Sequence, residues 1–268
     1  MPLAVCATPI GNLADVTLRV LAELAVADTV LCEDTRHTRV LLQRHGIEAR
    51  LLSYHQHNEA TRTAELIPRL VAGERMALVS DAGLPGVNDP GARLVVASIA
   101  AGVPVTVLPG ASAVETALVA SGLAGEQYRF VGYLPRKAGE LAALWEEIGA
   151  VPYPVVAFES PRRLGSSLAS LAALAPDRQV AVCRELTKVF EEVVRGTADE
   201  LAGLFTEEPK GEITLVIGPP TGEAPVPIDA AAAAVAELVA AGAPRRVAAE
   251  VVARLAGTSR NRLYRSSL

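Results

Sequence analysis

The stretch that decides the fold lies at residues 76–91 and reads MALVSDAGLPGVNDPG. It begins with a short apolar run, which is typical of a strand buried on both faces of a parallel sheet. Its second part, Ser80–Gly91, contains three glycines and two prolines in twelve residues. Glycine lets a backbone approach a ligand closely and proline stiffens the loop, so this part predicts a rigid binding loop. Asp89-Pro90 has the order of a capping residue followed by proline, which predicts a helix start.

The same succession of apolar run, polar loop and helical pattern recurs on both sides of this stretch. Asp15 or Thr17 is suited to cap one helix, Asn58 to cap another that stops at Gly73, and Gly102 to end a third. This alternation predicts a doubly wound parallel sheet. The expected strands are Leu3–Thr8, Thr29–Asp34, Arg50–Tyr54, Met76–Asp81 and Val103–Pro109.

A second sheet is predicted after Gly122. Its expected strands are Arg129–Leu134, Val155–Glu159, Gln179–Leu186, Phe190–Arg195 and Glu212–Ile217. The third and fourth of these are too close for a crossover helix, so they form a hairpin and make the sheet mixed. Helical patterns cover 140–148, 162–174 and 198–205, and three more follow a Pro/Gly-rich linker, at 230–241, 246–255 and 260–266. We therefore expect an N-terminal α/β domain (1–113), a C-terminal α/β domain (114–222), and a linker with a small basic helical tail (223–268).

Composition narrows the class of protein. Half of the 268 residues are hydrophobic and 21% are charged, which excludes a disordered chain. Cys6, Cys32 and Cys183 are widely spaced in apolar runs, so we expect buried, reduced thiols in a cytoplasmic protein. We expect no secretory leader and no membrane span, because no basic leader and no unbroken apolar stretch of sufficient length is present.

Charge is distributed unevenly along the chain. The net charge is −5, yet residues 243–268 carry six arginines and one glutamate. An acidic body with a basic tail weakens the argument that a negative protein avoids nucleic acid.

The ends of the five N-terminal strands are polar, glycine-rich or charged. In open α/β sheets, ligands bind at the carboxyl edge of the strands, so these ends predict a binding site. Neither a G-x-G-x-x-G sequence after the first strand nor a Walker A sequence is present, so NAD and ATP lack their usual signatures.

Eight motifs in a fixed order make the chain resemble the bacterial 2′-O-methyltransferases of small-subunit ribosomal RNA, which have the tetrapyrrole methylase fold. The motifs are Thr8–Leu13, Glu33–Arg36, His55–Glu59, Ser80–Gly91, Leu108–Gly110, Phe158–Arg163, Arg184–Lys188 and Gly211–Glu212. The resemblance implies S-adenosyl-L-methionine as methyl donor and a cytidine ribose in the decoding region of 16S RNA as acceptor. It also implies a donor cleft between two α/β domains, and a homodimer. Leu84, Gly86, Ala111 and Phe158 depart from the pattern, where Thr, a larger apolar residue, Pro and Tyr are usual.

Carried over motif by motif, the resemblance implies which residues bind the donor. Its methionine end is expected against the Ser80–Gly91 loop, its adenine near the end of the second sheet's first strand, and a closing motif at Gly211-Glu212. The implied residues are Pro9, Asp81, Gly83, Leu84, Pro85, Pro109, Gly110, Ser112, Ala113, Leu134, Gly211 and Glu212.

Methyl transfer to a ribose hydroxyl benefits from a base, because the hydroxyl is a poor nucleophile. Lys188 is a candidate if burial lowers its pKa, and it is otherwise a phosphate contact. Glu33, Asp34 and His55 are candidates because they end strands at the cleft. The segment Glu33–Arg36 also fits a salt-bridged helix start.

Basic side chains near the cleft and in the tail are candidates for RNA contact. They are Arg36, His57, Arg163, Arg245, Arg246, Arg260, Arg262 and Arg265. His55, His57 and Glu59 faintly resemble a metal pair, but no cysteine or third histidine lies nearby at ligand spacing, so we expect no metal.

Two rival functions stay open. The tail, with Thr258 or Ser259 before arginines and Tyr264, is typical of the recognition end of a helix-turn-helix, which suits a DNA-binding regulator with a ligand-sensing α/β domain. Alternatively, a methyltransferase of this fold acts on a tetrapyrrole or a protein. For the tail itself, three roles stay open: it binds RNA, it packs against the protein or forms a dimer contact, or it recognises DNA.

Overall fold

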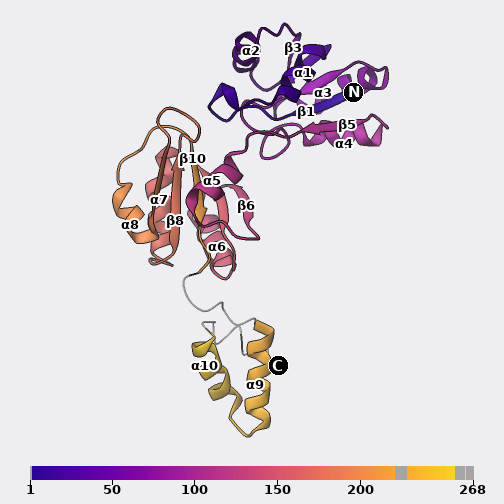
Figure 1. The fold of residues 1–268 in the computed structure, drawn as a ribbon. Coiled ribbons are helices and arrows are strands. Elements are labelled where there is room, and N and C mark those ends of the chain that lie inside the picture. The colour runs from indigo at the N-terminus through magenta and orange to yellow at the C-terminus, as the bar shows by residue number, and fades with distance from the viewer. Residues whose placement is uncertain (1, 221–227, 257–262, 264–268) are drawn as a thin grey trace.

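The computed structural model describes residues 2–220, 228–256 and 263. Within them, two five-stranded sheets follow one another along the chain, each covered by helices (Figure 1). None of the described helices combines the length and the apolar character that a membrane crossing requires.

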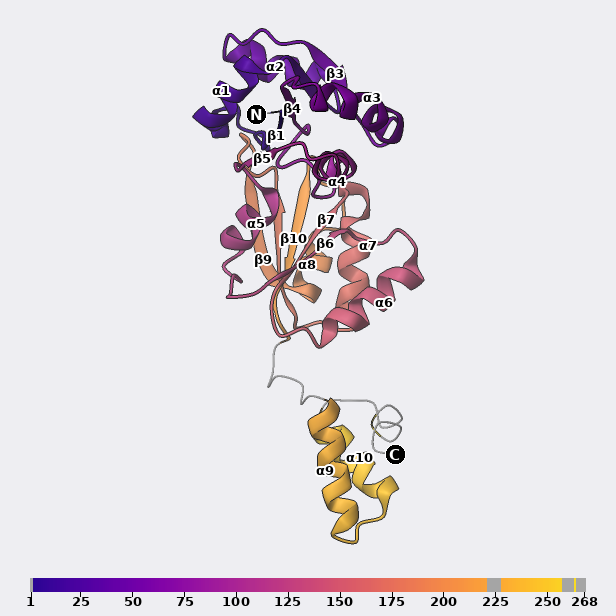
Figure 2. The ribbon, with the colours of Figure 1, turned by 90° about the vertical axis from the view of Figure 1, so that its right-hand side faces the viewer.

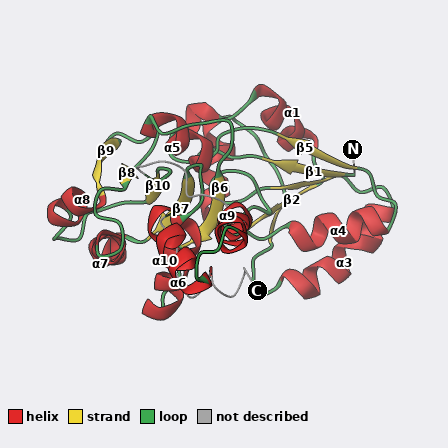
Figure 3. Ribbon diagram, turned by 90° about the horizontal axis from the view of Figure 1, so that it is seen from below, coloured by secondary structure: helices red, strands yellow, loops and turns green. Residues whose placement is uncertain are grey.

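The first sheet is wholly parallel, with strand order β3-β2-β4-β1-β5, which confirms the predicted doubly wound sheet. Its strands are β1 (Leu3–Cys6), β2 (Thr29–Cys32), β3 (Leu51–Ser53), β4 (Met76–Leu78) and β5 (Val105–Leu108). The apolar stripes of α1 (Leu18–Val26) and α2 (Thr35–Arg44) pack on one face. Helices α3 (Glu59–Val71) and α4 (Ala92–Ala100) lie side by side on the other (Figure 3).

The second sheet is mixed, with order β6-β7-β10-β8-β9. Strands β6 (Arg129–Tyr133) and β7 (Val155–Glu159) are parallel, and the remaining pairings, to β10 (Ile213–Ile217), β8 (Gln179–Arg184) and β9 (Glu192–Thr197), are antiparallel. Successive side chains of a strand point to opposite faces. Val156 therefore packs under α5 (Ala113–Ser121), whereas its neighbours Val155 and Ala157 pack under α6 (Ala138–Gly149), α7 (Pro161–Ala172) and α8 (Ala198–Leu204) (Figure 2).

The β8–β9 hairpin is present as predicted, but its loop is longer than the sequence suggests. Strand β8 ends at Arg184 and β9 begins only at Glu192. Between them, Glu185 (φ 52°) and Thr187 (φ 66°) adopt the left-handed conformation, which lies outside the range of regular strand backbone. The apolar residues Leu186 and Phe190 made the strands appear to extend into this loop.

The predicted start of α4 at Asp89-Pro90 is wrong by two residues. The helix begins at Ala92, and its capping position is Gly91, whose φ of 140° is accessible mainly to glycine. Asp89 therefore does not cap this helix. By contrast, Thr17 does cap α1, where its side chain accepts a hydrogen bond from the Val20 amide at 3.2 Å.

Beyond the undescribed segment 221–227, α9 (Ile228–Ala240) and α10 (Arg245–Leu255) pack against each other. Small residues such as Ala231, Ala248 and Ala249 let the two helices approach closely, and Val235 and Leu263 complete their shared core. The third helical pattern that the sequence predicts, at 260–266, falls outside the described residues except for Leu263.

All three cysteines are free and buried in the sheets, as expected. Burial raises the pKa of the Cys6 thiol to about 12 and that of Cys183 to about 11. Burial likewise raises the pKa of Cys32. At neutral pH these side chains act as small apolar residues of β1, β2 and β8.

Candidate functional site

A cavity of about 640 Å³ opens between the carboxyl edge of the first sheet and the adjoining edge of the second. This volume is typical of a site for a cofactor-sized ligand. Its walls come from four loop regions and the strands beside them. They comprise Ile10, residues 82–84 and 87–89, residues 109–115, Tyr128, Phe130, Tyr133, residues 158–161, Cys183, Leu186 and residues 211–214.

The floor of the cavity is a backbone cradle. Thr8 and Gly83 exchange backbone hydrogen bonds of 2.8 and 3.0 Å, which join the loop after β1 to the loop after β4. Thr8 Oγ1 also donates to the Ser80 carbonyl at 3.0 Å. On the facing loop, a Cβ added to Gly110 would lie 2.9 Å from that of Ala7. Only glycine allows the two backbones to come this close. The two loops are therefore packed tightly enough to give the cavity a defined shape.

One wall of the cavity is aromatic. The register of β6 against β7 shifts between Phe130 and Tyr133, and Gly132 within this irregularity has a φ of 71°. Such bulges re-aim a side chain, and here Tyr133 lines the cavity while 63% exposed. Phe158 stands between Phe130 and Tyr133, with ring centroids 5.0 and 5.5 Å away. These rings offer an edge-to-face stack for a planar ligand group.

The structure gathers eight of the twelve predicted donor-binding residues around this cavity. They are Gly83, Leu84, Pro109, Gly110, Ser112, Ala113, Gly211 and Glu212. Ser112 Oγ donates to Glu115, whose other oxygen accepts from the Tyr128 hydroxyl at 2.5 Å. The loop at 109–115 thus carries its own hydrogen-bond network.

The other four predicted donor residues do not line the cavity. Pro9, Pro85 and Leu134 are buried. The Leu134 backbone is held at both ends, since its amide donates to Phe158 and its carbonyl accepts from Arg163. Asp81 Oδ1 accepts from the Asp34 amide at 3.1 Å, so it positions the start of α2.

Two of the four predicted base candidates are engaged elsewhere. Asp34 caps α2 and forms an ion pair with Arg36 at 2.7 Å, as the helix-start interpretation predicts. Hydrogen bonds from Arg36 lower the Asp34 pKa to about 2. Lys188 pairs with Glu185 at 2.8 Å and Glu212 at 3.1 Å. Burial acts to lower the Lys188 pKa, but these two carboxylates outweigh it and raise the pKa. The condition under which Lys188 would serve as a base is not met.

The other two candidates lie at the first sheet's edge without lining the cavity. Burial and the charge of Asp81 raise the Glu33 pKa, and His55 opposes the shift. His55 is placed by Asn58, which accepts from its backbone amide at 2.9 Å and contacts ring Nε2 at 3.2 Å. Among the described residues, no group partners the buried His55 Nδ1.

Asp89 is the acid that sequence reasoning missed. It lines the cavity, and burial together with Glu33 and Asp81 raises its pKa from 3.8 to about 6. The signal was present in the Ser80–Gly91 loop, but the following proline made Asp89 resemble a helix cap.

Comparison with known proteins places this geometry in a family. The family model for tetrapyrrole (corrin/porphyrin) methylases matches residues 2–202. The chain belongs to the tetrapyrrole methylase family. Relatives named ribosomal RNA small subunit methyltransferase I include a Mesorhizobium japonicum protein, 46% identical over 98% of this chain and 90% of that protein. Another, from Micromonospora olivasterospora, is 45% identical over 96% of this chain and 83% of its own length.

Solved structures agree on the fold of the methylase. Diphthine synthase matches with a TM-score of 0.63 at 15% identity, covering 81% of this chain and 89% of its own. Uroporphyrin-III-C-methyltransferase from Thermus thermophilus matches with a TM-score of 0.56 at 24% identity, over 81% of this chain and 93% of its own.

The predicted RNA-contacting residues of the methylase are dispersed. Arg36 is exposed and paired with Asp34, and His57 is exposed beside the first sheet. Arg163 is bound to the Glu159 carboxylate at 2.7 Å. Arg245 and Arg246 begin α10. Arg260, Arg262 and Arg265 lie outside the described residues. In the part of the chain that the structure describes, no group of three His, Cys, Asp or Glu side chains could hold a metal ion.

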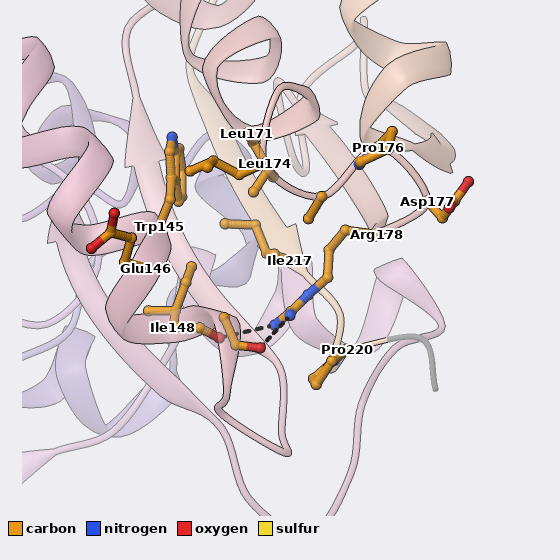
Figure 4. Close-up of a pocket in the computed structure, with 12 residues that line it drawn as sticks. Trp145, Glu146, Ile148, Leu171, Leu174, Pro176, Asp177, Arg178, Ile217 and Pro220 are labelled. Atoms are coloured by element: carbon orange, nitrogen blue, oxygen red, sulfur yellow. Dashed lines mark hydrogen bonds between the residues drawn. The ribbon is translucent and has the colours of Figure 1, made fainter. Parts of the chain in front are cut away.

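A second cavity of about 450 Å³ lies at the far end of β10 (Figure 4). Trp145, Leu171 and Pro220 line it together with Arg178. The buried Arg178 guanidinium donates to the carbonyls of Ile148, Gly149 and Gly218, at 3.2, 3.2 and 2.5 Å. This arginine closes the carboxyl end of α6 and the end of β10, so it is part of the scaffold of the methylase.

Proposed function

We propose that this chain is an S-adenosyl-L-methionine-dependent methyltransferase of small-subunit ribosomal RNA. The observation that carries the proposal is the cavity between the two sheets, in a chain 46% identical over nearly its full length to a protein named for that activity. We also propose a specific acceptor, which is a cytidine 2′-hydroxyl in the decoding region of 16S RNA.

The cavity suits the donor chemically. Backbone groups of residues 82–84 and 109–113 present a polar cradle for its amino-acid end. The aromatic wall of Phe130, Tyr133 and Phe158 offers a surface for its adenine. Bound there, the donor supplies an electrophilic methyl group, and the residues around it hold and orient the reacting partners.

The experiment is transfer of radiolabelled methyl groups to small ribosomal subunits, naked 16S RNA or duplex DNA, followed by mass mapping of the labelled fragment. A ribose 2′-O-methyl group blocks alkaline cleavage of the adjoining linkage, so alkali resistance at the labelled nucleotide identifies the acceptor atom. Label on a base would refute the 2′-O assignment. No label on any of the three substrates would favour the regulator, and label on DNA alone would indicate a DNA methyltransferase.

A fold-sharing methyltransferase with a tetrapyrrole or protein acceptor is the second candidate. The likeness to uroporphyrin-III-C-methyltransferase and diphthine synthase supports it only at the level of the fold. The same assay, run with a porphyrinogen or a soluble protein extract in place of RNA, separates it from the first.

We further propose that the enzyme acts in the cytoplasm as a homodimer. Val71 on α3 and Val96 and Ile99 on the adjacent α4 are 61%, 66% and 63% exposed, which offers apolar surface for a second copy. Light scattering should give the mass of two chains at micromolar concentration. A single-chain mass would contradict this.

A further inference from the structure

Four carboxylates line the cavity between the sheets: Asp89, Glu115, Glu159 and Glu212. Glu115 is bound by Ser112 and Tyr128, Glu212 by Lys188, and Glu159 by Arg163. Within the described part of the chain, no hydrogen-bond donor or cation contacts Asp89. Among the described residues, Asp89 is therefore the one carboxylate of the cavity wall that has no partner and can interact with a ligand.

The backbone holds Asp89 in this unpartnered position. Asn88 before it has a left-handed φ of 64°, and Gly91 after it has a φ of 140°. The Gly91 amide donates to Glu59 at 3.0 Å, which fastens the loop to the start of α3. A conformation of this kind persists only where the surroundings over-determine it, and such positions cluster at functional sites.

The charges around Asp89 favour its protonated form. Glu33 after β2 and Asp81 after β4 are the carboxylates whose fields act on it, and burial adds to their effect. Tyr133 lines the same cavity, and burial together with the charges of Glu212, Asp89 and Glu159 raises its pKa. A carboxylate whose pKa lies nearer neutrality is a stronger base once it ionises.

The structure favours Asp89 over the four candidates that the sequence offers. Asp34 is a helix cap with a lowered pKa, and Lys188 is held protonated by two carboxylates. Glu33 and His55 lie outside the cavity wall.

We propose that Asp89 is the general base that accepts the proton of the RNA ribose hydroxyl, an inference that rests on the proposed function. In the transfer, the methyl–sulfur bond of the donor breaks with its electron pair on sulfur, an oxygen–methyl bond forms, and the hydroxyl proton passes to Asp89. The protonated carboxyl then releases this proton to water.

The test compares Asp89→Asn with the wild-type full-length chain in single-turnover methylation of small ribosomal subunits. Asparagine keeps the shape of the side chain and removes its basicity. We expect the rate to fall by about 100-fold or more, while the affinity for S-adenosyl-L-methionine, measured by calorimetry, stays within about twofold. Asp177→Asn is the matched control, because Asp177 is exposed at the rim of the second cavity; its rate should equal that of the wild type.

One further readout needs no methyl transfer, and the pH dependence of the rate gives a second. Carbon NMR of the aspartate side chains should show one signal that titrates near pH 6 and disappears in Asp89→Asn. The wild-type single-turnover rate should rise with pH up to about 6 and then level off. Asp89→Glu, which restores a carboxylate, should recover part of the rate and its pH dependence.

The outcomes separate the base from its alternatives. An unchanged rate in Asp89→Asn overturns the proposal. A parallel loss of donor affinity of tenfold or more also overturns it, because Asp89 would then hold the cationic donor. If the wild-type chain itself labels no RNA, the proposed function has failed; the calorimetry and NMR still report on Asp89.

Discussion

Glu159 illustrates at the residue scale how the cavity wall carries charge. Its side chain is 1% exposed and accepts from the Ser160 amide, from two nitrogens of Arg163 and from the Ser167 hydroxyl. A buried carboxylate is tolerable only when its lone pairs are satisfied in this way. Because Arg163 also holds the Leu134 carbonyl, one guanidinium ties together the ends of β6 and β7.

Replacement of Arg163 should therefore destabilise the fold. Arg163→Ala leaves the Glu159 charge buried and unpaired, so we expect the free energy of unfolding to fall by about 3 kcal/mol or more. The neighbouring Arg162 is the control: it is 84% exposed and 3.5 Å from Glu208, and Arg162→Ala should change stability by no more than about 0.5 kcal/mol. Urea denaturation measures both, and equal effects would contradict the assignment of Arg163.

Asp89 also predicts a pH dependence of stability. Its pKa is about 6 in the folded protein against 3.8 as the ordinary value, so the folded state binds the proton more tightly. The contribution of protonated Asp89 to the free energy of unfolding is complete below pH 4 and is lost as pH rises through 6. Asp89→Asn, which resembles the neutral form, should raise the free energy of unfolding by on the order of 1 kcal/mol at pH 8 and hardly at pH 4. Melting curves at the two pH values decide this, and equal shifts at both would be inconsistent with it.

At the element scale, the contact between the β8–β9 loop and the loop after β1 joins the two halves of the site. The Asn12 amide donates to Thr187 Oγ1 at 3.0 Å. A Cβ on Gly11 would lie 2.8 Å from that oxygen and 3.0 Å from the Leu186 carbonyl. The two left-handed residues of the hairpin loop bring Thr187 and Lys188 against this glycine.

Gly11→Ala should force these loops apart. Overpacking of this kind costs about 1–3 kcal/mol, and we expect a lower melting temperature together with weaker donor binding. Gly139→Ala is the control, because a Cβ added there meets nothing within 4 Å and alanine is a better helix former than glycine in α6. Unchanged donor affinity in Gly11→Ala would mean that the contact does not shape the cavity.

The elements were largely predictable from sequence because apolar runs mark buried strands directly. All ten expected strands are present, and β7 has the predicted bounds. The loops were less predictable, since left-handed residues such as Glu185 and Thr187 have no composition signal. The same holds within the site. Glycine-rich loops indicated the cavity, whereas the proposed role of Asp89 depends on α4 starting at Ala92 and on Glu33, at the end of another strand, approaching the loop that carries Asp81 and Asp89.

At the scale of the whole molecule, the tail has a core of its own. Ala231, Val235 and Ala249 are at most 1% exposed between α9 and α10. The cavity, in turn, is lined entirely by residues 10–214. The cavity proposed to bind the donor and the basic tail therefore belong to different parts of the chain.

Truncation should separate these two properties. A chain ending at Gly222 should keep the donor affinity and melting temperature of the body, and lose most RNA affinity and its salt dependence, because phosphate contacts by arginine weaken steeply with salt. A full-length chain with Arg260, Arg262 and Arg265 replaced by glutamine should show the same loss with the tail present. Filter binding at several salt concentrations measures the RNA affinity of both variants. Undiminished RNA affinity would mean that the tail is a packing element. If the truncated chain folds but no longer binds the donor, the tail takes part in closing the cleft.

The three buried cysteines have a practical consequence. Alkylating reagents attack thiolates, and burial with raised pKa keeps Cys6, Cys32 and Cys183 protonated and covered in the native protein. A cysteine introduced at an exposed site, such as Ala64→Cys on α3 or Ala173→Cys at the end of α7, is then expected to react alone. A pair of fluorophores at these two positions would report changes in the spacing of the two sheets while a ligand enters between them, without removal of any natural thiol.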